Sequence, residues 1–249
     1  MMQANESGAA GAVQDRSKPA QIASWIHLAG FLLIGACVAS SGALLQHGGN
    51  GAANGQLASH GIAIHIYLAA LIMDWALFYY CWAGVHRFGG SLWSLSGGRW
   101  KSWKSVAIDI GIVVPFWLLW EGAAYAVATL LGPSSAKTVD SLLPKSLLEI
   151  TVWIATCITA GICEEMVFRG YLLKQFHALG GSVALAVAGQ GVVFGLFHWY
   201  QGWKNVVVIS MLGILYGLLA AWRKNLRANI VAHAWSDIWE GWLKFLILK

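Results

Sequence analysis

Residues 164–169 read Glu-Glu-Met-Val-Phe-Arg and lie inside one of the long apolar runs of the chain, after the mostly apolar residues 147–155. A charge in hydrocarbon costs from about 2.5 to well over 10 kcal/mol, so an ionisable residue in a membrane segment is by default a functional one. Glu165 and Arg169 are four residues apart, share a helix face and are expected to pair. Glu164 is rotated by about 100° from Glu165. It therefore faces another part of the protein and has no partner close in the sequence.

The composition indicates an integral membrane protein. Of the 249 residues, 58% are hydrophobic and 11% are charged, whereas a soluble domain has about 25% charged residues. The apolar residues form runs of about 20, the length that crosses a bilayer as a helix. The sequence therefore predicts an all-α, polytopic transmembrane helix bundle with about seven or eight spanning helices. The net charge of +5 and the 15 tryptophans fit anchoring at the membrane surface, with lipid as a partner, and no basic cluster is dense enough for nucleic-acid binding.

The order of the apolar runs sets the expected domain organisation. Residues 1–20 are polar and rich in small residues, lack a signal-peptide pattern, and are expected to form a disordered cytoplasmic tail. Residues 21–249 are expected to form a single transmembrane helical domain. Its expected spans cover residues 22–45, 62–85, 106–131, 146–179, 182–200, 205–222 and 228–249. An eighth helix requires residues 85–104 or 133–145 to dip into the membrane.

Lysine and arginine are unevenly distributed between the two sides of these spans. Seven spans place 11 of them on the N-terminal side: Arg16, Lys18, Arg87, Arg99, Lys101, Lys104, Arg169, Lys174, Arg223, Lys224 and Arg227. They place 5 on the other side: Lys137, Lys145, Lys204, Lys244 and Lys249. Because basic residues favour the cytoplasmic side, this bias predicts a multi-pass membrane protein with a cytoplasmic N-terminus.

Further polar residues in the C-terminal half occur at four-residue spacing, namely Phe194 with His198 and His233 with Asp237. Glu164 lies 17 residues before Gly181, in a predicted turn, and His198 lies 17 residues after it. In straight antiparallel helices both would lie about 25 Å from that turn, and therefore level with each other. His233 follows Arg227 by only six residues, within about 10 Å of the cytoplasmic end. The site therefore lies nearer mid-membrane, or the helices are tilted and unequal.

These residue types permit water activation. A carboxylate in a low-dielectric pocket is a candidate general base. Two histidines can hold the water, donate to a leaving amine or bind a metal. Glu164, His198 and His233 also match a zinc-hydrolase ligand set, although without the H-E-x-x-H spacing. Asp74, in the second run, is interpreted either as a functional residue or as a packing residue bonded to a neighbouring helix.

Three motifs in order, Glu164-Glu165-x-x-x-Arg169, Phe194-x-x-x-His198 and His233-x-x-x-Asp237, resemble those of the CAAX-protease and bacteriocin-processing (CPBP, or Abi) family of intramembrane proteases. This family includes the type II CAAX prenyl endopeptidases. The resemblance covers about residues 140–240, the expected catalytic core. It implies hydrolysis of a peptide bond in a membrane-anchored or lipidated protein, in a bacterial inner membrane.

The resemblance also implies roles for individual residues. Glu164 resembles the general base that activates water, His198 would help to bind that water, and Glu165 and Arg169 would brace the first motif, with Phe194 as a supporting residue.

His233 and Asp237 would stabilise the oxyanion, an interaction that supplies most of the rate enhancement in many acyl transfers. The prenyl endopeptidases carry Asn where this chain has Asp237, and an ionised carboxylate cannot donate a hydrogen bond. Asp237 must therefore be protonated, or must orient His233.

The resemblance leaves two mechanisms and two other functions open. A metalloprotease with zinc on Glu164, His198 and His233 and a metal-independent glutamate enzyme are equally compatible with it. A non-catalytic protein of the same fold could act in bacteriocin self-immunity or secretion by binding a partner, but the presence of both Glu164 and His198 favours the protease. The second alternative is a proton-coupled transporter. An inverted repeat with paired broken helices would favour it, and none is visible in the sequence.

Overall fold

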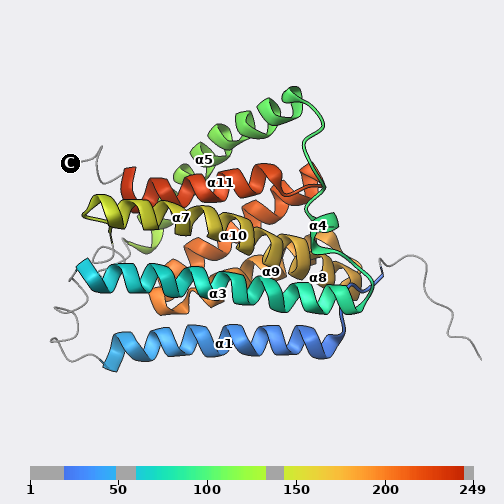
Figure 1. Ribbon diagram of the computed structural model, residues 1–249, viewed down its shortest axis with the longest axis horizontal. Coiled ribbons are helices and arrows are strands. Elements are labelled where there is room, and N and C mark those ends of the chain that lie inside the picture. Colours follow the sequence, from blue (N-terminus) through green and yellow to red (C-terminus); the bar gives the residue numbers. More distant parts are fainter. Residues whose placement is uncertain (1–19, 49–59, 133–142, 244–249) are drawn as a thin grey trace, which may run out of the picture.

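The computed structural model describes residues 20–48, 60–132 and 143–243, and every regular element in these ranges is a helix, which confirms the all-α class (Figure 1). The first elements are α1 (Trp25–Gly48), α3 (His60–Arg87), α4 (Leu92–Leu95) and α5 (Trp103–Leu131). They are followed by α7 (Leu147–Glu164), η1 (Glu165–Leu172), α8 (Leu173–Gly180), α9 (Val183–Phe197), η2 (Trp199–Gln201), α10 (Trp203–Arg223), α11 (Arg227–Ile238) and η3 (Trp239–Leu243). The predicted tail falls on residues 1–19, outside the described part.

The bundle is polytopic, with helices of unequal length. Within the described residues, four helices are long and apolar enough to cross a membrane: Ala63–Arg87, Trp103–Leu131, Leu147–Gly180 and Trp203–Arg223. The apolar stretch Trp25–Ser41 of α1 and helix α9 are shorter. The fifth predicted span is thus only 15 residues long in the structure, less than the roughly 20 that a crossing needs. The sequence left open either a site nearer mid-membrane or helices that are tilted and unequal, and the structure has helices of unequal length.

Several turns, two of which carry basic residues, gather at one end of the bundle. Figure 1 shows α4, the α8–α9 turn and the α10–α11 turn at this end, where α1 also begins. The amide of Leu226 donates to the carbonyl of Ser96 at 2.8 Å, which ties the α10–α11 turn to the segment after α4. We call this end, defined by residues 88–102, 180–182 and 223–227, the basic end. Among the described residues, Arg99, Lys101, Arg223, Lys224 and Arg227 of the predicted cytoplasmic group therefore lie at one end, and the orientation of this end stays a prediction.

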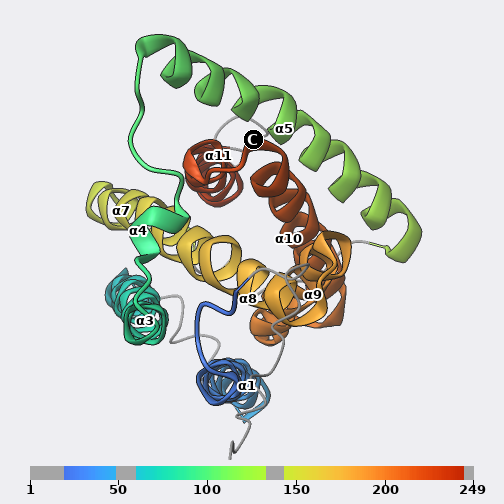
Figure 2. The same ribbon diagram turned by 90° about the vertical axis from the view of Figure 1, so that its right-hand side faces the viewer.

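A buried carboxylate joins two elements at the basic end. Asp109 of α5 is fully buried and accepts hydrogen bonds from Arg223 Nη2 at 2.6 Å, Arg227 Nε at 3.0 Å and Trp100 Nε1 at 2.9 Å. This cluster fixes the start of α5 to the turn between α10 and α11. Figure 2 shows the rest of α5 lying obliquely across the outside of α10 and α11.

Glycines allow α9 and α10 to pack at short distance. A Cβ atom on Gly191 would lie 2.7 Å from the backbone nitrogen of Ile214, and one on Gly213 would lie 2.8 Å from the Cα of Gly191. No side chain fits at either position. Small residues that let helix backbones approach are typical of membrane bundles, where dispersion replaces the hydrophobic effect between helices.

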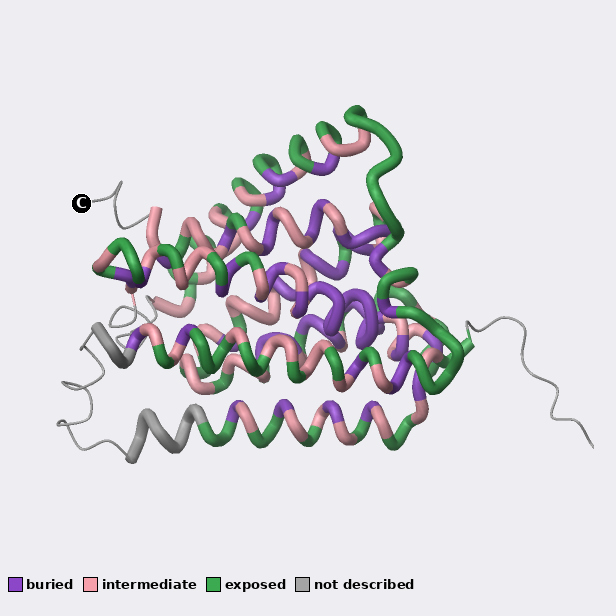
Figure 3. Tube along the Cα trace, viewed as in Figure 1, coloured by how far each residue is buried: buried purple, intermediate pink, exposed green. Residues whose placement is uncertain are grey.

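The helix predicted to start near residue 146 is the most buried element. It begins with a capping box, in which Glu149 N donates to Ser146 Oγ at 3.2 Å and Ser146 N donates to Glu149 Oε2 at 3.2 Å. It ends at Gly181, whose φ of +71° suits glycine. Between them, all eight residues of η1 are buried, and Figure 3 shows the buried residues concentrated there. η1 is a π-helix, which the sequence did not predict.

Candidate active site

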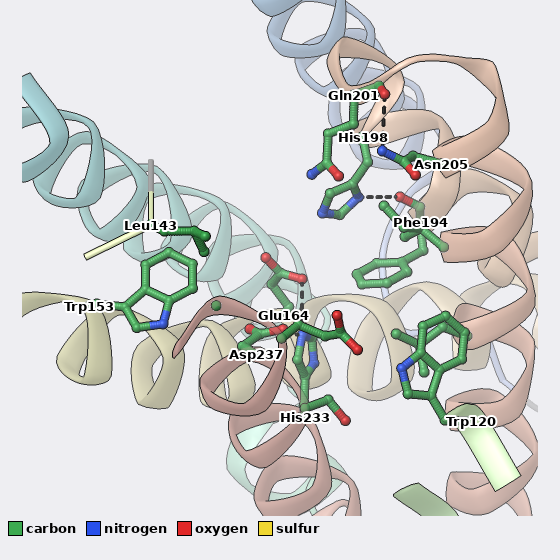
Figure 4. Close-up of a pocket in the computed structure, with 15 residues that line it drawn as sticks. Trp120, Leu143, Trp153, Glu164, Phe194, His198, Gln201, Asn205, His233 and Asp237 are labelled. Atoms are coloured by element: carbon green, nitrogen blue, oxygen red, sulfur yellow. Dashed lines mark hydrogen bonds and ion pairs between the residues drawn. The ribbon is translucent and has the colours of Figure 1, made fainter. Parts of the chain in front are cut away.

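A cavity of about 410 Å³ opens between the helices of the C-terminal half. Glu164 reaches it from the end of α7, His198 from the end of α9, and His233 and Asp237 from α11 (Figure 4). The four residues are separated by up to 73 positions in the chain. The structure therefore brings together all four residues that the sequence analysis singled out as catalytic.

Three of these side chains form a tight group. His233 Nε2 lies 3.7 Å from Glu164 Oε2 and 3.7 Å from Asp237 Oδ2. The side chain of His233 is 4% exposed, whereas those of Glu164 and Asp237 are 21% and 35% exposed. The two carboxylates are therefore open to the cavity, and one imidazole nitrogen lies between them.

The other nitrogen of His233 is held by Glu165. His233 Nδ1 lies 2.8 Å from Glu165 Oε1, which also accepts a hydrogen bond from Arg169 Nη1 at 2.8 Å. The second oxygen of Glu165 accepts from Asn229 Nδ2 at 3.2 Å. Because the Glu165 carboxylate is paired with a guanidinium, it acts as an acceptor, so His233 Nδ1 carries the hydrogen. Glu165 thereby orients the imidazole, whereas Asp237 faces its other nitrogen.

Arg169 is fully buried in a cage of aromatic rings and carbonyls. Its guanidinium carbon lies 4.5 Å from the ring centre of Phe194 and 5.0 Å from that of Tyr216. Its Nη2 donates to the carbonyl of Gly213 at 3.2 Å. Cation–π contacts gain strength when the cation is desolvated. The predicted pair of Glu165 and Arg169 thus exists, and both side chains are buried.

Tyr216 supports the imidazole from the face. Its ring stacks on His233 with centroids 5.1 Å apart and an angle of 17° between the planes, and its hydroxyl lies 3.2 Å from Ser236 Oγ. With Glu165 at the edge and Tyr216 on the face, the ring of His233 has a defined plane and a defined direction for Nε2.

His198 is positioned at the end of α9. It is the C-cap of that helix, and its Nδ1 lies 2.8 Å from the carbonyl oxygen of Phe194. Since a carbonyl only accepts, Nδ1 must donate, and neutral His198 then keeps Nε2 as an acceptor. The side chain lies on the α9 side of the cavity, apart from the group around Glu164 (Figure 4).

The zinc set considered from the sequence does not fit this arrangement. No group of three His, Cys, Asp or Glu side chains suited to hold a metal occurs among residues 20–41, 63–132 and 143–243. The hydrogen bonds of His233 Nδ1 to Glu165 and of His198 Nδ1 to the Phe194 carbonyl leave both Nε2 atoms available, so the misfit lies in the placement of the three side chains and not in these bonds. Glu164, His198 and His233 therefore line one cavity but do not converge as ligands of a single ion.

Several residues of the site were not found from the sequence. Asn229 precedes His233 by four positions, so the same helical spacing that linked His233 to Asp237 could have indicated it. Tyr216 lies in an apolar helix with no pattern that distinguishes it. Asp74 of α3 interacts electrostatically with Glu164 and His233, which places it near the site rather than on a remote face.

Comparison with known proteins agrees with this geometry. Residues 146–239 match a protein-family model described as type II CAAX prenyl endopeptidase Rce1-like. No curated protein and no solved structure matches the chain. The matched stretch contains all three motifs and, at the level of the family, indicates an endopeptidase. The family match and the four long apolar helices together indicate a membrane protein. Residues 146–239, less than half of the chain, therefore resemble the type II CAAX prenyl endopeptidase Rce1-like family, which supports the relationship to CAAX proteases that the three motifs indicate.

Proposed function

We propose that this protein is an intramembrane endopeptidase that hydrolyses a peptide bond in a membrane-anchored or lipidated, CAAX-type substrate. One observation carries the proposal: Glu164, His198 and His233, from three helices, line one cavity inside an apolar bundle. A carboxylate open to such a cavity is a suitable general base. The family match supports the reaction class.

In the proposed reaction, Glu164 removes one proton from a water molecule, while His198 Nε2 accepts a hydrogen bond from the O–H that remains on the water oxygen. The oxygen attacks the carbonyl carbon of the substrate and forms a tetrahedral oxyanion. The C–N bond then breaks, and Glu164 transfers the proton to the leaving amine. No atom or electron is left unbalanced, because the water supplies both the hydroxyl of the new acid and the hydrogen of the new amine.

His233 is proposed as the donor to the oxyanion. Its Nδ1 is bound to Glu165 and its Nε2 lies near two further carboxylates, at 3.7 Å from each. Three carboxylates around one imidazole favour its cationic form. Both ring nitrogens of an imidazolium donate, so Nε2 is available to a developing negative charge. The ion pair of Glu165 with Arg169 then keeps the ring in place.

Asp237 is proposed to act through His233. At the position where prenyl endopeptidases carry Asn, this chain has a carboxylate beside the Nε2 atom. Such a carboxylate stabilises the cationic ring and does not itself need to donate. Its effect on the reaction is therefore electrostatic.

The experiment is cleavage of a membrane-peptide library, with and without a lipid anchor, by the purified protein in vesicles. We expect Glu164→Gln to lower the cleavage rate by about 10²- to 10⁴-fold, the usual contribution of general-base catalysis. Glu121→Gln, the same change on α5 outside the cavity, is the matched control and should keep full activity. Full activity of Glu164→Gln would refute the general-base role. A folded wild-type protein that cleaves no peptide would favour the partner-binding alternative.

A further inference from the structure

A second cavity, of about 310 Å³, lies at the basic end of the bundle, away from the candidate active site. Its lining includes four side chains that can carry positive charge: Arg169, Lys174, His177 and Lys224. The rest of its described lining is apolar apart from Asn225, and no acidic residue of the described chain lines it. We call this cavity the basic pocket.

The buried cation of the basic pocket has an unused donor. Arg169 is 1% exposed, and its Nη1 and Nη2 atoms donate to Glu165 and to the Gly213 carbonyl. Its Nε has no hydrogen-bond partner among the described residues. A buried donor without an acceptor is unfavourable, so an acceptor placed beside Arg169 would be stabilising.

Lys174 also has donors to spare. Its Nζ donates to the carbonyl of Leu95 at 2.9 Å, and an ammonium has three hydrogens. That bond anchors the half-buried ammonium at the wall of the pocket. Lys224 is exposed at the mouth, in the turn that ends α10.

Four exposed tryptophans lie in or directly beside the segments that form the basic end. Trp93, Trp100, Trp103 and Trp222 belong to elements of the basic end, and all four are exposed. Tryptophan is enriched where the hydrocarbon meets the headgroups. These tryptophans are consistent with a membrane interface at the end of the bundle that carries the basic pocket.

We propose that the basic pocket binds a phosphate group, carried by an anionic lipid headgroup or present as free phosphate. Phosphate oxygens are strong acceptors for guanidinium and ammonium groups. Basic pockets between membrane helices are suited to lipid headgroups. A bound phosphate supplies acceptors for Lys174 and Lys224 and neutralises these two lysines, which have no acidic partner in the described lining, whereas the charge of Arg169 is already paired with Glu165. The proposal does not depend on the proteolytic activity.

The test uses the full-length protein in neutral detergent, with retained lipid measured by native mass spectrometry after exposure to phosphatidylglycerol or phosphatidylcholine. We expect phosphatidylglycerol to be retained preferentially, and Lys174→Gln with Lys224→Asn to lower its retention at least tenfold. Asn suits position 224, where φ is +53°. The matched control, Lys101→Gln with Lys104→Gln, removes two exposed lysines from the same end and should retain lipid like the wild type.

A second arm separates the two sources of phosphate. The melting temperature is measured in detergent while inorganic phosphate is added. A phosphate-dependent rise in the wild type that is lost in the Lys174 and Lys224 variant, without a lipid preference, assigns the pocket to free phosphate. A lipid preference assigns it to a headgroup. Equal losses in the pocket variant and the control overturn the proposal, as does the absence of both responses.

Far-UV circular dichroism checks that the variants fold. Should the double variant unfold, Lys224→Asn alone, on an exposed turn, carries the test. It should then lower retention of phosphatidylglycerol at least threefold, and unchanged retention overturns the proposal.

Discussion

Replacing Glu165 by glutamine should destabilise the protein far more than the same change at Glu164. Glu165 is fully buried and accepts hydrogen bonds from Arg169, His233 and Asn229. Glutamine keeps the shape but removes the charge, so the enclosed guanidinium of Arg169 is left unpaired. Removal of one partner of a buried ion pair costs about 3–5 kcal/mol. Since native proteins are stable by about 5–15 kcal/mol, this is a large part of the total.

The matched change at Glu164 should cost less than about 1 kcal/mol, because its ion-pair partner His233 lies 3.7 Å away and the Glu164 side chain is partly exposed. The assay is the free energy of unfolding from a titration with sodium dodecyl sulfate in mixed micelles. The variant Glu165→Gln with Arg169→Met removes both charges. Its loss should be smaller than the sum of the two single losses by about 2–3 kcal/mol, as expected for residues that interact directly. Losses within about 1 kcal/mol of each other for Glu164→Gln and Glu165→Gln would refute the role given to the buried pair.

Three further predictions use the same preparation. Gly191→Ala should lower the free energy of unfolding by about 1–3 kcal/mol, because the added Cβ atom would meet the α10 backbone. The control Gly122→Ala should not lower it, because a Cβ atom there meets no atom within 4 Å. Equal effects of the two changes would contradict the close packing of α9 and α10. Asp109→Asn should lower the free energy of unfolding by about 1–3 kcal/mol in the same titration. This loss is smaller than for a fully buried pair, because Arg223 and Arg227 are partly exposed. A loss below about 0.5 kcal/mol would show that the Asp109 cluster contributes little to stability. Treatment with a chelator followed by a cleavage assay should leave the rate unchanged, and a tenfold loss restored by zinc would reverse the assignment of a metal-independent base.

The four candidate catalytic residues could be predicted from the sequence because their chemistry is costly in an apolar chain. Glu164 and His198 are ionisable groups beside long hydrophobic runs, and their equal spacing from Gly181 placed them at one level. This inference required only the rise per residue of a helix and the position of one turn. The structure has both residues at one cavity, although α9 is shorter than a full span.

The environment of these residues was harder to predict. Tyr216 and Gly213 act through a ring face and a carbonyl, and neither leaves a signal in an apolar helix. The role of Glu165 in holding His233 depends on the approach of α11 to η1, which is a tertiary contact. Asp109 was not singled out, since its three partners lie up to 118 positions away. Local spacing cannot indicate contacts of this kind.

The π-helix η1 makes the long helix sensitive to changes in length. Eight residues after Glu164 follow a wider turn, and α8 then continues to Gln175. The buried amide of Gln175 accepts from the amides of Ile22 and Ala23 and donates to the carbonyl of Ala23, so it fastens the entry of α1. Deleting one residue from η1 would turn Gln175 by about 100° relative to Glu164. In evolutionary terms, we expect this stretch to accept substitutions more readily than insertions or deletions, because a single missing codon would separate the contacts of the first helix from the helix that bears Glu164.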